Sequence, residues 1–293
     1  MHRPRLLGLP AMTIVAVTGC PLLSSAEQPF FEQFKYTVVQ VHCLRPAAQT
    51  VDNLMQPVGT AFWVQTADGL VLVSNKHVFS KRTEILLSQY SGPTEPSATM
   101  IVALRDSTGK QLWVGHPDSL VDIAAIRVKY FKRVGDTRAK PLGISETLFA
   151  SADELVEGDD VFVLGFPLGI RTIRKSYPVI MSGIISLRPT EDFLVLANGK
   201  VIGRNIYLID ANINSGNSGS PVFLKPLLAR PFLQPGAFGA VVAPKLIGIV
   251  SAYVNTLMPV VQSDTGSYAR ANSGLVVVHR AEQIKDVVQL ALQ

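Results

Sequence analysis

The chain has 293 residues, of which 47% are hydrophobic and 17% are charged. Such a chain can bury a sizeable core, and its composition excludes an intrinsically disordered protein, which needs low hydrophobicity and high net charge. The formal net charge of +5 is spread thinly along the sequence, so we expect no nucleic-acid partner.

Residues 1–26 predict an export signal. Arg3 and Arg5 precede an uncharged apolar run over residues 6–23, which is the order of a signal peptide.

The end of this run offers two possible cleavage sites. Val17 to Cys20 resembles a bacterial lipobox, which would leave Cys20 lipidated and attach the protein to a membrane, whereas the small residues 24–26 suit an ordinary signal peptidase. A third possibility is that the segment remains as an uncleaved membrane anchor, which its prolines and glycines disfavour. We expect an exported protein, either a periplasmic or outer-membrane lipoprotein or a secreted one.

Cys20 and Cys43 are the only cysteines. If Cys20 is removed or lipidated, Cys43 has no partner for a disulfide. Cys43 ends an apolar β-branched run, which predicts a buried and inert thiol. The sequence has no paired C-x-x-C and no H-E-x-x-H arrangement, so we expect neither a metal site nor a cofactor.

After the signal, short β-branched runs alternate with Gly, Pro, Asn and Asp, which is typical of an all-β sandwich or barrel. Apolar residues at helical spacing predict one helix, over 281–292. A charged stretch around 129–142 is the best boundary between an N-terminal half, 27–140, and a C-terminal half, 141–293, and residues 225–244 predict a long surface loop. The predicted strands are 36–44, 59–65, 70–74, 98–104, 121–128, 160–164, 179–187, 205–209, 221–224, 246–253 and 274–278.

Asn214-Ser215-Gly216-Asn217-Ser218-Gly219-Ser220-Pro221 lies between two predicted strands. A serine hydroxyl needs an adjacent base to become a nucleophile, and backbone N–H groups must converge on the oxyanion that its attack creates. Glycines beside the serine permit the tight backbone that turns those groups inward. By itself the octet is equally compatible with an ordinary turn.

His77 follows two predicted strands joined by a turn, and Asp122 is the one carboxylate in the apolar run around 121–128. Histidine is the natural general base near neutral pH. An aspartate in an apolar strand needs a partner, and the second ring N–H of a histidine supplies one. Each residue alone is compatible with a structural role, as we expect for His42, His116 and His279. The order His, Asp, Ser along the chain strengthens the catalytic interpretation.

Three motifs resemble those of trypsin-like serine peptidases, and their nearest likeness is to bacterial HtrA-type protease domains. They are Gly216-Asn217-Ser218-Gly219 with Pro221, Gly59 to Phe62 with Ser74 to Val78, and Asp122-Ile123-Ala124. Segments 165–169, 182–186 and 248–251 resemble further HtrA-type segments in the right order. The resemblance extends from about Val58 to the end of the chain.

The resemblance implies a chymotrypsin-like fold of two antiparallel six-stranded β-barrels with a C-terminal helix. His77 and Asp122 would come from the first barrel and Ser218 from the second. The N–H groups of Gly216 and Ser218 would form the oxyanion hole, with Asn217 shaping its loop. Extended peptides would pair with Ser251, Ala252 and Tyr253, and Asn212 would form the base of the pocket for the residue before the scissile bond.

This sequence departs from the family pattern at three positions. Ser220 stands where glycine is usual, and Lys76 stands where many members have a small residue. Asn217 replaces the aspartate that zymogen-type relatives pair with a freed N-terminus, so activation by that route is not expected. After the predicted helix we expect no PDZ domain of the kind that many HtrA proteases carry.

The sequence therefore predicts a serine endopeptidase that acts on extended protein or peptide substrates through an acyl-enzyme. The alternative is a catalytically silent barrel that binds peptides in the cell envelope, which Ser220 and Lys76 favour. An accidental match on a structural β protein is the third reading.

Overall fold

The computed structural model describes residues 32–44, 55–127, 129, 131–134, 141–172, 174–196, 199–225, 244–259 and 268–293. The expected export signal, with Cys20, lies outside the described residues, as does most of the predicted loop over 225–244. Within the described ranges no helix is both long and apolar enough to span a lipid bilayer.

Nine strands of the first half form one sheet, in the order β6-β7-β3-β2-β1-β4-β5-β8 with β9 paired to β2. Val71 and Val73 of β3 pack into a core shared with the second half, whereas Leu72 between them packs into the core of the first half. Because both faces are covered, the strand is a continuous apolar run. The strands are β1 (Val38–Leu44), β2 (Met55–Thr66), β3 (Gly69–Ser74), β4 (Glu84–Gln89), β5 (Ala98–Ala103), β6 (Val114–Gly115), β7 (Ala124–Arg127), β8 (Phe131–Val134) and β9 (Ile144–Ser145).

Six strands of the second half close into an antiparallel barrel, in the order β10-β11-β14-β17-β16-β15. Its core holds the apolar side chains of all six strands. The barrel strands are β10 (Asp160–Gly165), β11 (Val179–Leu187), β14 (Ile206–Ala211), β15 (Pro221–Leu224), β16 (Lys245–Pro259) and β17 (Tyr268–Arg280). A separate hairpin joins β12 (Phe193–Val195) and β13 (Val201–Arg204), and the 3-10 helices are η1 (Gln33–Tyr36), η3 (Glu146–Leu148), η4 (Ala152–Glu154) and η5 (Pro167–Gly169).

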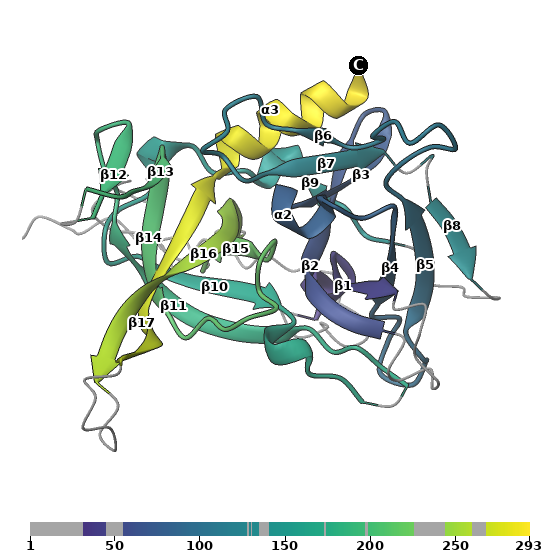
Figure 1. Ribbon diagram of the computed structural model, residues 1–293, viewed down its shortest axis with the longest axis horizontal. Helices are drawn as coiled ribbons and strands as arrows, with labels where there is room; N and C mark the ends of the chain where they lie inside the picture. The colour runs from purple at the N-terminus through teal and green to yellow at the C-terminus, as the bar shows by residue number, and fades with distance from the viewer. Residues whose placement is uncertain are drawn as a thin grey trace, which may run out of the picture.

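Helix α3 (Ala281–Leu292) connects the two halves. It follows β17 directly, and Figure 1 shows it lying across the first half, over β6 and β7. Its apolar side chains at helical spacing are buried in the core shared by both halves, namely Ile284, Val287, Val288 and Ala291. The last segment of the second half therefore completes the core of the first.

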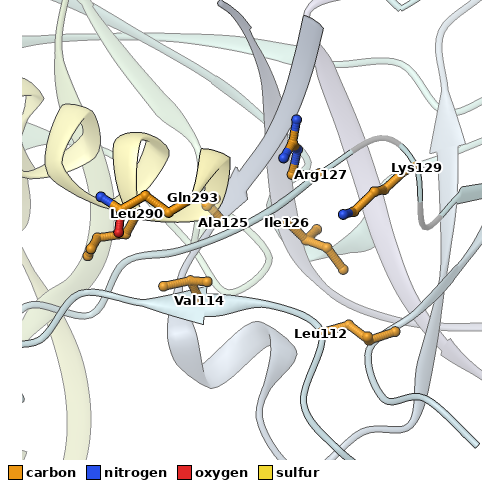
Figure 2. Close-up of a pocket in the computed structure, with 9 residues that line it drawn as sticks. Leu112, Val114, Ala125, Ile126, Arg127, Lys129, Leu290 and Gln293 are labelled. Carbon is orange, nitrogen blue, oxygen red and sulfur yellow. The ribbon is translucent and has the colours of Figure 1, made fainter. Parts of the chain in front are cut away.

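Arg127 of β7 fixes the end of α3 by donating from Nη1 to the carbonyl of Leu292 at 3.0 Å. A cavity of about 210 Å³ opens at this junction, and Figure 2 shows Arg127, Lys129 and Gln293 at its edge with Val114 and Ile126 along its wall. None of the residues that line this cavity belongs to the predicted site.

The all-β architecture with a C-terminal helix is confirmed, but three details differ from expectation. The first sheet of the described chain is open, so only the second half is a closed six-stranded barrel. The predicted strand over 121–128 begins at Ala124, which leaves Asp122 in the preceding turn. The stretch over 129–142 contains β8, and β9 still pairs with β2, so the chain leaves the first sheet after Ser145 rather than at residue 140.

Candidate active site

His77 lies on α2 (Lys76–Phe79), a single helical turn that follows β3. Val78 and Phe79 are buried in the core of the first half and fix this turn against the sheet. The side chain of His77 is 48% exposed, because it points away from that core. Burial of Val78 and Phe79 thus keeps the ring of His77 at the surface.

Asp122 binds His77 twice. The two side chains approach to 2.5 Å between His77 Nδ1 and Asp122 Oδ2, and the backbone N–H of His77 donates to Asp122 Oδ1 at 3.2 Å. A neutral ring that donates from Nδ1 keeps Nε2 free to accept a proton. The arrangement therefore selects the tautomer that a general base requires.

The backbone of Asp122 is also fixed on both sides. Its carbonyl accepts a hydrogen bond from Asn75 Nδ2 at 2.7 Å, and its N–H donates to His279 Nε2 at 3.0 Å. Ser251 Oγ donates to Asp122 Oδ2 at 3.4 Å. Burial lowers the pKa of His279 to about 4, so near neutral pH the ring is an uncharged acceptor. Sequence reasoning assigned His279 only a structural role. The available signal was the position of His279, a polar residue directly after the buried apolar residues of β17.

Lys76, one of the departures from the family pattern, supports the turn before Asp122. Its Nζ donates to the carbonyl of Asp118 at 2.8 Å, and Arg204 Nη1 pairs with the Asp118 carboxylate at 2.8 Å. Burial lowers the pKa of Lys76, and the negative charges of Asp122 and Asp118 oppose that shift. Lys76 therefore ties the helical turn of His77 to the segment that precedes Asp122.

Ser218 lies in a tight loop that main-chain hydrogen bonds hold in place. Its carbonyl accepts from Thr60 N–H at 2.8 Å, and Gly219 N–H donates to Val250 at 2.9 Å. Gly216 and Gly219 have φ angles of 99° and 88°, a region that other residues rarely adopt. A Cβ on Gly219 would lie 2.0 Å from the Thr60 carbonyl oxygen. The loop conformation therefore requires glycine at both positions.

The carbonyl groups before the nucleophile are turned away from the cleft. Ser215 O accepts from Leu168 N–H at 2.6 Å, and Gly216 O accepts from Thr60 Oγ1 at 2.9 Å. In a trans peptide the C=O and N–H groups point in opposite directions, so the N–H of Gly216 points away from Leu168. Among the described residues the N–H groups of Gly216 and Ser218 have no hydrogen-bond partner. They are therefore available to donate hydrogen bonds to an anionic oxygen.

Asn217 and Ser220 form the underside of this loop, and both are fully buried. Asn217 N–H and Nδ2 both donate to Asn214 O, at 3.2 and 3.3 Å, and Ser220 Oγ donates to Asn217 Oδ1 at 3.4 Å. A Cβ on Gly165 would lie 2.0 Å from Ser220 Oγ. The hydroxyl that departs from the family pattern thus occupies space that Gly165 leaves open, and it does not enter the cleft.

A cavity of about 300 Å³ lies beside Ser218. The predicted substrate-binding residues Ser251, Ala252 and Tyr253 line it, together with Ile213, Asn214, Ser215, Val250 and Asn255. Asn212, expected at its base, is exposed and does not line the cavity, whereas its buried neighbour Ile213 does. The difference arises because side chains alternate in an extended segment.

On the other side of His77 a wider hollow of about 570 Å³ is lined by residues 80–84 and by Cys43. Cys43 is a free thiol and is half-buried rather than buried as expected. Among the described residues no cluster of three His, Cys, Asp or Glu side chains could hold a metal ion.

Ser251 links the two parts of the candidate site, because it lines the cavity beside Ser218 and donates to Asp122, the partner of His77. Within the described residues the ring of His77 bonds only to Asp122, and no hydrogen bond joins it to the Ser218 hydroxyl. The fold and this site define a β protein of two halves, with His77 and Asp122 on the sheet of the first half and Ser218 on the barrel of the second.

The chain belongs to the trypsin-like peptidase domain family, which matches residues 59–225, more than half of the sequence. The resemblance to this family, and with it the chymotrypsin-like fold, is confirmed. No curated protein sequence matches the chain.

Solved structures of proteases share the fold at low sequence identity. HtrA-type protease AlgW with a tripeptide superposes with a TM-score of 0.51 at 19% identity, over 88% of this chain and 61% of that one. The protease domain of MamO from Magnetospirillum magneticum gives 0.48 at 18% identity, over 87% of this chain and 97% of that one. The inactive form of Rv3671c protease gives 0.46 at 17%, over 90% and 92%. The likeness to AlgW, at 19% identity, shows the fold alone, and this chain spans about three fifths of the length of the AlgW chain.

Proposed function

We propose that the chain is a serine endopeptidase that hydrolyses peptide bonds through Ser218, His77 and Asp122. The observation that carries the proposal is the His77–Asp122 pair, in which both oxygens of one carboxylate are bound by the same histidine. Such a pair leaves Nε2 available as a base, at the cleft that also holds Ser218. Membership of the trypsin-like peptidase family supports the same reaction.

In the proposed reaction His77 Nε2 removes the proton of Ser218 as Oγ bonds to the substrate carbonyl carbon. The electron pair of the carbonyl moves onto its oxygen, and the N–H groups of Gly216 and Ser218 stabilise the resulting anion. Asp122 stabilises the charged ring. When the tetrahedral intermediate collapses, the C–N bond breaks and His77 protonates the leaving amine. Water, deprotonated by His77, then releases the acyl group and regenerates Ser218.

The proposed substrates are proteins or peptides in extended conformation. Ser251, Ala252 and Tyr253 lie on β16 beside the nucleophile, and they line the cavity next to Ser218. A peptide that pairs with this strand would place one side chain in that cavity. With Ile213 and Val250 in its wall, the cavity suits an uncharged apolar side chain of modest size.

We also propose that the protein acts outside the cytoplasm, on the strength of its N-terminal sequence. Either a lipid on Cys20 or ordinary signal cleavage would produce the mature chain. Incorporation of radiolabelled palmitate that disappears in Cys20→Ala would support the lipoprotein, and incorporation that survives this substitution would contradict it.

A fluorophosphonate probe tests the proposed activity directly, because it reacts only with an activated serine. We expect the purified protein to be labelled, Ser218→Ala to be unlabelled, and Ser220→Ala to be labelled as a matched control on the same loop. Absence of labelling, or labelling that persists in Ser218→Ala, would overturn the proposal in favour of a silent peptide-binding barrel.

A further inference from the structure

Strand β16 continues well past the barrel that it helps to close. It pairs with β15 only as far as Ile249, opposite Pro221, but it pairs with β17 up to Pro259, opposite Tyr268. Figure 1 shows these two strands projecting beyond the rest of the second half. We call residues 255–259 and 268–272 the arm. At about 3.4 Å per residue, the part of β16 beyond Val250 is about 30 Å long.

One edge of this part of β16 is open. Past Val250, the only strand paired with β16 among the described residues is β17. Ala252, Tyr253 and Asn255 are exposed along it. An unpaired edge presents a row of backbone N–H and C=O groups that an extended chain can bind. The open edge begins at Ser251, inside the candidate site, and continues into the arm past a register shift between Tyr253 and Asn255.

The arm is fixed to the wall of the substrate cavity. Asn272, which faces Asn255 across the hairpin, donates from Nδ2 to the carbonyl of Ile213 at 2.5 Å. Ser273 Oγ donates to the carbonyl of Val254 at 2.7 Å. Both bonds lie where the pairing register shifts between Tyr253 and Asn255. The base of the arm is therefore held in a set direction relative to the cavity next to Ser218.

We propose, on the basis of the proposed peptidase function, that the arm extends the substrate-binding strand. A peptide that runs antiparallel to Ser251, Ala252 and Tyr253 has its scissile bond at Ser218, and its preceding residues continue past Tyr253 toward Asn255 and Pro259. About five or six further residues can pair there at the spacing of a β-strand. Because main-chain groups make these bonds, the arm selects long unfolded segments with little regard to their sequence.

Peptides of increasing length test this directly. We expect kcat/KM to be similar for peptides with two or four residues before the scissile bond, or to rise modestly between them. It should then rise at least about tenfold from four residues to eight, since each added strand bond contributes about 1 kcal/mol and each tenfold needs about 1.4 kcal/mol. No rise beyond four residues in the native protein would overturn the proposal.

A variant with a shortened arm tests whether the gain with peptide length comes from the arm. Thr256 and Ala271 are cross-strand partners, so residues 257–270 can be replaced by Asn-Gly, which closes a two-residue hairpin. This variant keeps Asn272 and every candidate catalytic residue. We expect it to cleave the four-residue peptide as the native protein does and to show no further gain with length. An equal gain in both proteins would overturn the proposal.

N-methylated peptides provide a test that needs no variant. Adjacent residues of a strand point their N–H groups to opposite sides, so methylation at positions five to eight before the scissile bond should reduce kcat/KM at alternate positions only. Equal effects at all positions, or none, would contradict strand pairing.

The proposed function and this inference fail in distinguishable ways. If fluorophosphonate does not label Ser218, the peptidase proposal fails. Binding of fluorescent peptides to Ser218→Ala, with and without the shortened arm, then shows whether the arm binds extended chains. Affinity that rises with length only when the arm is intact supports the inference, and affinity independent of the arm overturns it.

Discussion

The two sides of the candidate site are supported by different kinds of interaction. On the Asp122 side, side chains from distant segments make the supporting hydrogen bonds, and Asn75 and His279 hold the backbone of the aspartate. On the Ser218 side, main-chain hydrogen bonds to Thr60 and Val250 hold the loop. Each hydrogen bond that supports Asp122 can be removed separately, by substitution or by protonation of one side chain. The loop of Ser218 is instead disrupted chiefly by substitutions that add side-chain atoms to a closely packed position.

The largest expected effect comes from the Asp122 side. Asp122→Asn keeps the shape of the side chain but presents an amide N–H₂ to His77, which favours the wrong ring tautomer. We expect kcat/KM to fall on the order of 10⁴-fold, with the thermal unfolding midpoint nearly unchanged. Asp118→Asn, four residues earlier, is the control and should retain most of the activity. A fall of less than about tenfold in Asp122→Asn would contradict the assigned role of Asp122.

Acid should weaken the fold through its buried histidines, of which one supports Asp122. Burial lowers the pKa of His42 and of His279 from 6.5 to about 4, so the unfolded chain binds more protons between these values. Stability is therefore complete above about pH 6.5 and is lost as the pH falls toward 4. We expect each histidine to remove about 2 kcal/mol between pH 7.5 and pH 5.

Urea unfolding at the two pH values measures this loss. His42→Leu and His279→Gln should each lose less stability between pH 7.5 and pH 5 than the native chain. His279→Gln keeps an acceptor for the Asp122 N–H, so its activity at pH 7.5 should exceed that of His279→Leu. A free energy of unfolding that is the same at both pH values in the native chain would refute the prediction.

Added volume should damage the Ser218 side. In Gly165→Ala the new methyl group would lie 2.0 Å from Ser220 Oγ and 2.6 Å from Asn217 Oδ1. We expect a loss of about 1–3 kcal/mol of stability and a fall in fluorophosphonate labelling. The double variant Gly165→Ala with Ser220→Gly should recover part of both, because the hydroxyl no longer occupies that space. Strictly additive effects of the two substitutions would argue against this packing.

The smallest effect concerns Lys76. Lys76→Ala removes one hydrogen bond, to the carbonyl of Asp118, and no group that touches substrate. We expect a loss of about 1 kcal/mol or less in stability and less than about fivefold in kcat/KM. A much larger fall in kcat/KM with unchanged KM would show that Lys76 acts on the His77–Asp122 pair.

Much of the fold was predictable because the local pattern and the tertiary environment agree. Strand β11 (Val179–Leu187), strand β15 (Pro221–Leu224) and helix α3 were predicted with their observed bounds. Strand β4 was not, since Ile85, Leu86 and Leu87 form a short apolar run that is also compatible with a helix. The far end of β16 was missed because Asn255 and Thr256 interrupt the apolar run, and pairing with β17 is what makes the whole segment a strand.

The site was predictable where a motif encodes chemistry, as for His77, Asp122 and Ser218. It was not predictable where two residues meet across the chain. The bond from Asp122 to His279 joins positions 157 apart in sequence, and the fit of Ser220 depends on the missing side chain of Gly165. The first relation depends on the packing of one half against the other, and the second depends on two segments of the second half that are far apart in sequence.

The position of α3 has a consequence for the order in which the protein assembles. Asp122 is made early in synthesis, but its backbone N–H bonds to His279, and α3 covers the sheet beside it only after residues 281–292 have been made. The first half therefore emerges from the ribosome before α3 can cover part of its core and before His279 can bond to Asp122. Because β17 and α3 complete both the bonds around Asp122 and the core of the first half, the two halves depend on each other for stability.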